Sequence, residues 1–96
     1  MRERDVESYL KTNIERIGGM CLKFVSPGKS GVPDRICLLP NGRQFFVELK
    51  APGKKLTALQ RKVKKQFMQL GHTVFVADCK KEVDEIIDYV TGRWPE

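Results

Sequence analysis

Apolar residues near the start of the chain recur with the spacing of an amphipathic helix. Four of them fall at i, i+4, i+8 and i+11, namely Val6, Leu10, Ile14 and Ile17. This spacing places them on one helix face, and the Gly18-Gly19 pair that follows favours an end to the helix. The pattern predicts a helix over residues 3–17, with its apolar stripe facing a core.

The next part of the chain reads as short apolar strands separated by loops. The predicted strands cover residues 20–25, 34–39 and 43–50, and the last two form a hairpin. The segments SPGKSGVP and APGKKL, at 26–33 and 51–56, are rich in Gly, Pro and Ser or Lys and are predicted to be loops.

A second helix is predicted to begin at Thr57. The Thr-x-x-Gln spacing that ends at Gln60 fits a capping box, and Gly71 suits the helix end. The apolar stripe predicted to be buried consists of Leu59, Val63, Phe67 and Leu70. A strand over 72–79 follows, and then a helix over 81–91 that turns Val83, Ile86, Ile87 and Val90 inward.

The resulting order, α-β-β-β-α-β-α, predicts an α/β fold in which helices flank a mixed sheet. We expect residues 1–96 to form a single domain, because the chain shows no repeat and no linker. No apolar run approaches the roughly 20 residues that cross a bilayer, and the N-terminus lacks the apolar region of a signal peptide. We therefore expect a cytoplasmic protein without a membrane partner. The three distant cysteines are expected to be free thiols, not zinc ligands.

Charge is distributed unevenly along the chain, whose net charge is +6. No acidic residue lies between Glu48 and Asp78, whereas this interval holds Lys50, Lys54, Lys55, Arg61, Lys62, Lys64 and Lys65. A one-sided basic surface suits a polyanion such as nucleic acid. Charge alone is equally compatible with a solvated helix face that binds nothing.

The loop between the hairpin strands decides which side chains share a face. A two-residue Asn41-Gly42 turn would place Asp34 and Glu48 on opposite faces of the sheet. A three-residue loop, with Pro40 in a type I turn and Gly42 in the left-handed region, instead pairs Asp34 directly with Glu48. We favour the second register because every turn residue has a fitting role in it. Lys50 then shares their face.

Two carboxylates that face each other repel unless a positive charge lies between them. A divalent cation bound by oxygens relieves this repulsion, and a lysine beside it can position or deprotonate a water. A metal ion with an activated water can cleave a phosphodiester. The alternative is a hairpin end with an ordinary Glu48–Lys50 pair, but Asp34 after Gly-x-Pro favours the catalytic interpretation.

The segments Pro33-Asp34 and Glu48-Leu49-Lys50 resemble the signature of the PD-(D/E)xK nuclease superfamily. The match narrows to the VRR-NUC family, whose signature is similar to SGVPD, FVELKAPG, the Leu56-Thr57 pair with Gln60, and GHTVFV. The resemblance covers nearly the whole chain and is closest to small stand-alone members from phages or prophages. It implies a restriction-endonuclease-like sheet and a Mg²⁺- or Mn²⁺-dependent DNA endonuclease.

The resemblance also implies roles for individual residues. Asp34 and Glu48 would be metal ligands together with the backbone carbonyl of Leu49, and Lys50 would serve the attacking water and the scissile phosphate. Glu7 on the first helix would match the acidic residue that completes many such sites. Glu7 is alternatively a solvated helix residue, with Glu3, Asp5 and Glu15 nearby.

Gln60 would match the catalytic glutamine that follows the E-x-K strand, but the same side chain is predicted to cap its helix. The two roles compete for one side chain. The expected DNA contacts are Lys29, Ser30, Lys54, Lys55, Arg61, Lys62 and Lys65. Gly28-Lys29-Ser30 is not a phosphate loop, because the glycine that such a loop needs is replaced by Lys23.

Size suggests how such a small nuclease would work. A single site cuts one strand, so we expect a homodimer that acts on branched DNA such as a four-way (Holliday) junction. Trp94, a large apolar residue in a polar tail, is a candidate for the interface. The alternatives are a monomeric nickase of duplex or flap DNA, a non-catalytic nucleic-acid-binding module with a nuclease fold, and a structural domain.

Overall fold

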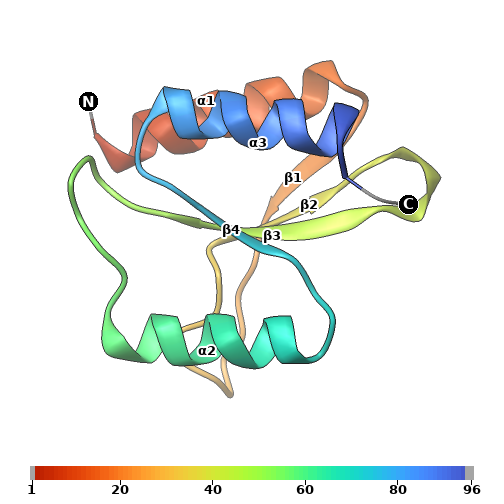
Figure 1. Cartoon of the computed structure of the whole chain (residues 1–96). Coiled ribbons are helices and arrows are strands. Elements are labelled where there is room, and N and C mark those ends of the chain that lie inside the picture. The colour runs from red at the N-terminus through yellow and green to blue at the C-terminus, as the bar shows by residue number, and fades with distance from the viewer. Residues whose placement is uncertain (1, 95–96) are drawn as a thin grey trace.

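The computed structural model describes residues 2–94, and Figure 1 shows the arrangement of their helices and strands. The elements run α1 (Glu3–Arg16), β1 (Met20–Lys23), β2 (Arg35–Leu38), β3 (Gln44–Leu49), α2 (Ala58–Gln69), β4 (Val74–Ala77) and α3 (Lys80–Gly92), with a short helical turn η1 (Pro40–Gly42) between β2 and β3. The predicted order of helices and strands is confirmed, and most ends shift by only one or two residues. The last two residues of the predicted tail lie outside the described part of the chain.

The four strands form one mixed sheet in the order β1-β2-β3-β4. β2 runs antiparallel to both of its neighbours, β1 and β3, and β4 runs parallel to β3. A parallel neighbour requires a crossover connection, and α2 supplies it. In Figure 1, α1 and α3 lie side by side on one face of the sheet, while α2 lies alone on the other.

The main core lies between the sheet and the pair α1 and α3. Alternate strand residues point into it, including Cys37, Phe45, Val47 and Leu49. They meet the predicted stripe of α1 and the apolar face of α3, contributed by Val6, Leu10, Ile14, Val83, Ile86 and Val90. The cysteines are free thiols, as predicted, and two of them are buried in or beside this core.

The face beneath α2 holds a much smaller apolar cluster. The ring of Phe46 lies 5.2 Å from that of Phe24 and 5.0 Å from that of Phe67, both edge-on. Val63 is the only α2 side chain that is fully buried. The prediction that Leu59 and Leu70 are buried was wrong, because they are 47% and 77% exposed. One helix over a narrow cluster buries only its central residues, and Leu70 already caps the helix end.

The ends of α2 are fixed as the sequence predicted. The Gln60 backbone N–H donates to Thr57 Oγ1 at 3.1 Å, and the Thr57 N–H donates to Gln60 Oε1 at 2.9 Å. At the other end, Gly71 has φ +90° and the His72 N–H donates to the Phe67 carbonyl at 3.1 Å. This pattern is a Schellman motif, which satisfies carbonyls that the helix leaves without partners.

The hairpin has the predicted register but a different turn. Leu39 N–H donates to the Arg43 carbonyl at 2.7 Å, so a three-residue loop joins the strands. Asn41 and Gly42 both have positive φ, 69° and 76°, whereas a type I turn would keep Asn41 negative. Asparagine tolerates the left-handed region well, so two successive left-handed residues can form here.

The C-terminal tail returns to the molecule's own hairpin. The Trp94 ring lies 5.6 Å from that of Phe45 and beneath the Arg43 guanidinium, at 4.6 Å. The Trp94 carbonyl also accepts a hydrogen bond from Arg43 Nη2 at 3.1 Å. The proposed interface role for Trp94 therefore loses its basis, because the ring is half-buried against its own sheet and not presented as an exposed apolar residue.

Candidate active site

The hairpin register brings Asp34 and Glu48 together at one end of the sheet. Arg35 pairs with Val47 in the β2–β3 ladder. Asp34 immediately precedes Arg35, and Glu48 immediately follows Val47, so in this antiparallel pair the two acids lie opposite each other. Asp34 and Glu48 are therefore cross-strand neighbours. Their side chains point to the α2 face, because strand residues alternate and the adjacent Val47 and Leu49 point into the main core.

Asp34 is held by two backbone contacts. Its Oδ2 accepts a hydrogen bond from the Leu49 N–H at 2.7 Å, and its carbonyl accepts one from the Phe24 N–H at 2.9 Å. The first bond fixes the carboxylate against β3, and the second continues the pairing with β1. Among the described residues, no other backbone N–H or basic side chain donates to the Asp34 carboxylate, and the neighbouring Glu48 carboxyl is the group that shares a proton with it. The half-buried side chain thus keeps acceptor capacity for a ligand.

Glu48 is the least satisfied acid in the described part of the chain. The residue is only 3% exposed, and its Oε1 is buried without a hydrogen-bond partner. Burial, and then the adjacent Asp34 carboxylate, raise the pKa of Glu48 to about 8. A pKa this high means that the pair holds a proton at neutral pH while no positive charge lies between the two carboxyl groups. A divalent cation bound by both groups would supply that charge and displace the proton, so the pair fits the metal that the sequence implied.

Lys50 shares this face and supplies the nearby positive charge. It lies two residues after Glu48 along the chain, so its side chain points to the same face of the sheet. Its positive charge opposes the rise in the Glu48 pKa. Its backbone N–H donates to the Ala77 carbonyl at 3.0 Å, which extends the parallel pairing with β4. The half-buried side chain thus stands beside the acid pair on a fixed backbone.

Glu7 and Gln60 have other partners in this structure. Glu7 Oε2 accepts a hydrogen bond from Arg35 Nε at 2.9 Å, and Gln60 Oε1 is engaged in the capping box of α2. Within residues 2–94, no group of three potential metal-ligating side chains includes Asp34 or Glu48. The acid pair is thus formed without Glu7, and the predicted catalytic roles of Glu7 and Gln60 stay predictions. Glu3, in the first turn of α1, makes a smaller contribution to the raised pKa of Glu48.

Comparison with known proteins identifies the family to which this hairpin belongs. The model of the VRR-NUC domain matches residues 3–81, which include both loops and all four strands. The chain belongs to the VRR-NUC family. A relative named "Putative nuclease p44", from Acyrthosiphon pisum secondary endosymbiont phage 1, is 49% identical over 80 residues, covering 83% of this chain and 86% of its own length.

A solved structure described as a VRR_NUC domain has the same fold. It superposes with a TM-score of 0.84 at 32% identity, over 96% of this chain and 97% of its own. The mixed sheet with helices on both faces is therefore the arrangement of this family, and the chain spans nearly the whole of that solved domain. This VRR-NUC domain is thus a member of a nuclease family in both sequence and fold.

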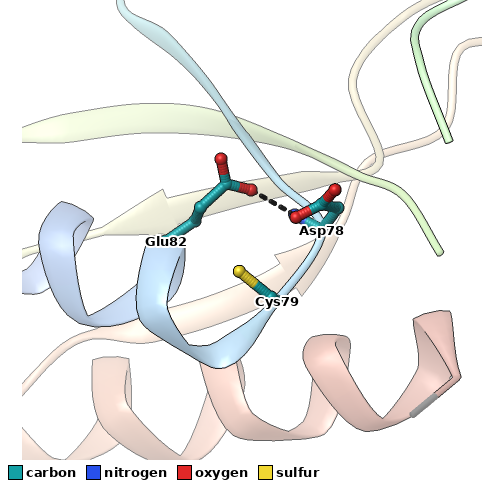
Figure 2. Close-up of side chains that lie close together, drawn as sticks. All are labelled: Asp78, Cys79 and Glu82. Carbon is teal, nitrogen blue, oxygen red and sulfur yellow. Dashed lines mark hydrogen bonds between the residues drawn. The ribbon is translucent and has the colours of Figure 1, made fainter. Parts of the chain in front are cut away.

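A second cluster of potential ligands lies at the corner between β4 and α3 of this VRR-NUC domain. Figure 2 shows Asp78, Cys79 and Glu82, whose ligand atoms all lie within 4.8 Å of one another. Glu82 Oε1 accepts the Asp78 backbone N–H at 2.7 Å, and Asp78 Oδ2 accepts the Gly53 N–H at 3.1 Å. These bonds fix the corner between β4 and α3 and tether the 51–56 loop, so the cluster has a structural explanation. Sequence analysis missed it, although an Asp-Cys-x-x-Glu spacing at a helix start was visible.

The basic residues predicted to contact DNA gather around α2 and its flanking loops. Lys54, Lys55, Arg61, Lys62 and Lys65 are all exposed, as are Lys29 and Ser30. An open groove of about 500 Å³ on the outer side of α2 is lined by Leu56, Arg61, Lys64, Lys65, Met68 and Gln69. The role of these residues in DNA contact stays a prediction.

Gly31 joins the 26–33 loop to α2. A Cβ on Gly31 would lie 2.9 Å from Leu59 Cγ and 3.1 Å from Val63 Cγ2, so only glycine allows this approach. Its φ of +85° also favours glycine. Lys29 and Ser30 are therefore held beside the first half of α2, close to the basic residues of that helix.

No helix among residues 2–94 is both long and apolar enough to span a membrane.

Proposed function

We propose that this VRR-NUC domain is a metal-dependent DNA endonuclease that hydrolyses phosphodiester bonds at the Asp34–Glu48 end of the hairpin. The observation that carries the proposal is the buried Oε1 of Glu48, which has no partner and lies beside a second carboxylate. A protein that only binds DNA gains nothing from two acids aimed at phosphates, because phosphate binding relies on positive charge.

The Asp34 and Glu48 carboxylates and the Leu49 backbone carbonyl would hold a Mg²⁺ or Mn²⁺ ion. Such an ion supplies charge neutralisation at the phosphate and lowers the pKa of a coordinated water. Lys50 would orient the attacking water and contact a phosphate oxygen. The water oxygen forms a bond to phosphorus, the bond to the leaving oxygen breaks, and that oxygen takes up a proton. Gln60 would assist if its side chain left the capping box.

The basic residues around α2 would hold the DNA backbone. We propose contacts from Lys29, Ser30, Lys54, Lys55, Arg61, Lys62 and Lys65, which are exposed on the loops and helix that border the α2 face. Every helix and strand of residues 2–94 belongs to the single sheet-and-helix fold, so this part of the chain carries no added reading helix or zinc module for base recognition. Recognition by DNA shape is therefore favoured over recognition by sequence.

Branched DNA is the proposed substrate, and the working form is a homodimer. One acid pair cuts one strand, and a two-fold axis would supply a second pair in the symmetric placement that a four-way junction requires. The enzyme would act on intracellular DNA in a bacterial or phage-infected cell, in keeping with its phage relative. The competing function is a monomer that nicks duplex or flap DNA.

The decisive experiment is a cleavage assay on a four-way junction labelled on all four strands, with Mg²⁺, Mn²⁺ or a chelator. Asp34→Ala, Glu48→Ala and Lys50→Ala should each lose cleavage while circular dichroism shows the fold retained. Asp88→Ala, an exposed acid on α3, is the matched control and should cut normally. Full cleavage in chelator or in any active-site variant would refute the nuclease mechanism.

The same assay, combined with light scattering, tests the substrate and the assembly. Symmetric cuts on two strands, together with twice the monomer mass, support a dimer that resolves junctions. A strict monomer that prefers linear duplex would exclude this substrate preference and leave the proposed chemistry at Asp34 and Glu48 intact.

A further inference from the structure

A buried arginine lies directly behind the candidate active site. Arg35 follows Asp34 in sequence, is 8% exposed, and points to the α1 and α3 face, opposite to the Asp34 side chain. Its Nε donates to Glu7 Oε2 at 2.9 Å, and its Nη1 donates to the Cys21 carbonyl at 3.0 Å. One guanidinium thereby joins α1, β1 and β2 at the residue next to Asp34.

The charge of Arg35 requires a partner at this position. The guanidinium sits among core residues such as Cys21, Cys37 and Val47, which offer no charged group. A buried ion is tolerated when it is paired and hydrogen-bonded, and it is costly when its partner is removed. The pair of Glu7 and Arg35 is the one salt bridge found among residues 2–94.

This pair bears on the position of Asp34 through a short stretch of backbone. The Cα of Arg35 is fixed from the core side by Glu7 and the Cys21 carbonyl. The neighbouring Asp34 is fixed from the other side by its bonds to the N–H groups of Leu49 and Phe24. A shift of Arg35 would rotate the adjacent peptide and move the Asp34 carboxylate away from Leu49.

We propose that Glu7 is a positioning residue that acts through Arg35 on Asp34, and not a metal ligand. The proposal rests on the nuclease function proposed above. It gives Glu7, the acid on α1, a positioning role in place of the metal-ligand role that the resemblance implied. Glu7, Asp34 and Glu48 do not form a group of ligand atoms within 4.8 Å of one another, so Glu7 would have to move to share an ion with the acid pair. Its Oε2 is held by Arg35, and a movement that broke this bond would leave a buried guanidinium without its counter-charge, which is strongly unfavourable.

Four variants separate a positioning residue from a ligand. Glu7→Gln removes the charge but keeps an acceptor for Arg35 Nε. Glu7→Ala and Arg35→Met each break the pair from one side. The double variant Glu7→Leu/Arg35→Met replaces the pair with apolar groups of similar length, which proteins often accept without loss of stability. Glu15→Ala, exposed on the same helix, serves as the control for α1.

The first readout is Mn²⁺ affinity of the folded protein, measured by calorimetry without DNA. Removing a group that orients a ligand weakens metal binding by about 10- to 100-fold, so Glu7→Ala and Arg35→Met should both show such a loss. Glu7→Gln should lose less than Glu48→Gln does, and the double variant should recover most of the affinity. A loss in Glu7→Gln equal to that in Glu48→Gln, with no loss in Arg35→Met, would overturn the proposal in favour of a ligand.

The second readout does not depend on metal or cleavage. The Leu49 amide donates to Asp34, so its hydrogen-exchange rate reports the position of that carboxylate. Glu7→Ala should speed this exchange by at least about tenfold relative to the Phe46 amide, which donates to Thr73 and reports opening of the sheet. Unchanged relative exchange would refute the positioning role. If the wild type binds no Mn²⁺ and cuts no DNA, the nuclease proposal fails, while the Leu49 amide still decides the role of Glu7.

Discussion

The two faces of the sheet differ sharply in what they bury. On β3, Phe45, Val47 and Leu49 point to α1 and α3 and complete a continuous core. The residues Phe46, Glu48 and Lys50 point the other way, where one aromatic cluster beneath α2 gives way to the acid pair. Strand alternation therefore separates the core residues of this strand from the residues proposed to be catalytic.

This separation explains how a domain of 96 residues can keep an unsatisfied carboxylate. A small domain has little stability to spare, and a buried acid without a partner reduces it further. Two helices close one face of the sheet completely, so the other face need not be optimised for packing. The comparison predicts that substitutions on the two faces will affect different measurements.

The largest expected effect separates activity from stability. Glu48→Gln should lower the cleavage rate by at least about a hundred- to a thousandfold, the size expected when a charge-stabilising group is removed from an active site. Its melting temperature in chelator should not fall, because the variant removes an acid whose Oε1 has no partner. Parallel kinetics and calorimetry check both halves. A large loss of stability would show that Glu48 belongs to the structural face after all.

For Phe45, on the core face of the same strand, we expect the opposite result, namely a large loss of stability. Phe45→Ala should destabilise the fold by about 3–5 kcal/mol, because Phe45 is fully buried against Phe75 and Trp94. Phe46→Ala should cost less, since its cluster is smaller and Phe46 keeps 8% of its surface exposed, whereas Phe45 keeps none. Urea unfolding of both variants measures the difference. Equal costs would contradict the claim that the two faces contribute unequally.

The basic border of the α2 face should control the salt dependence of DNA binding. Each lysine that contacts a phosphate contributes about one unit to the slope of log affinity against log salt. Replacing Lys54, Lys55, Lys62 and Lys65 with alanine should therefore flatten the slope by up to about four units. The matched control removes equal charge from the other face, through alanines at Lys11, Arg16, Lys80 and Lys81. Equal flattening in both would show that only net charge matters.

The smallest expected effect on stability is at an exposed position of α2, and it is compared with that of a buried position on the same helix. Leu70→Ser should change the free energy of unfolding by less than about 0.5 kcal/mol, because this leucine is 77% exposed at the helix cap. Val63→Ala on the same helix should cost more, since Val63 is 1% exposed. A cost for Leu70→Ser as large as that for Val63→Ala would mean that another surface covers Leu70 in solution.

Much of this arrangement was predictable because it depends on local rules. Turn chemistry around Asn41-Gly42 and strand alternation placed Asp34 opposite Glu48 before the fold was known. The capping box of Thr57 and Gln60 and the glycine end of α2 also follow from short-range hydrogen bonding. Such features need no knowledge of distant segments.

Two of the errors and omissions are local, namely the turn type at Asn41 and the cluster of Asp78, Cys79 and Glu82. The others involve partners that are distant in sequence. Glu7 lies 28 residues from Arg35, so no local pattern revealed their pairing. The exposure of Leu59 and Leu70 depends on how little of the sheet α2 covers, although their spacing alone fitted a buried stripe. Trp94 bonds to Arg43, which lies 51 residues earlier in the sequence. Periodicity identifies an apolar face but does not say how much surface will cover it.

The close approach of Gly31 to α2 bears on the surface that is proposed to contact DNA. Because the missing side chain lets this backbone lie against Leu59 and Val63, the loop and the helix behave as one solid border. The backbones that carry Lys29 and Lys62 are thus packed together through Gly31, while their side chains are exposed. If both lysines contact DNA as proposed, the spacing of their backbones is set before the DNA arrives.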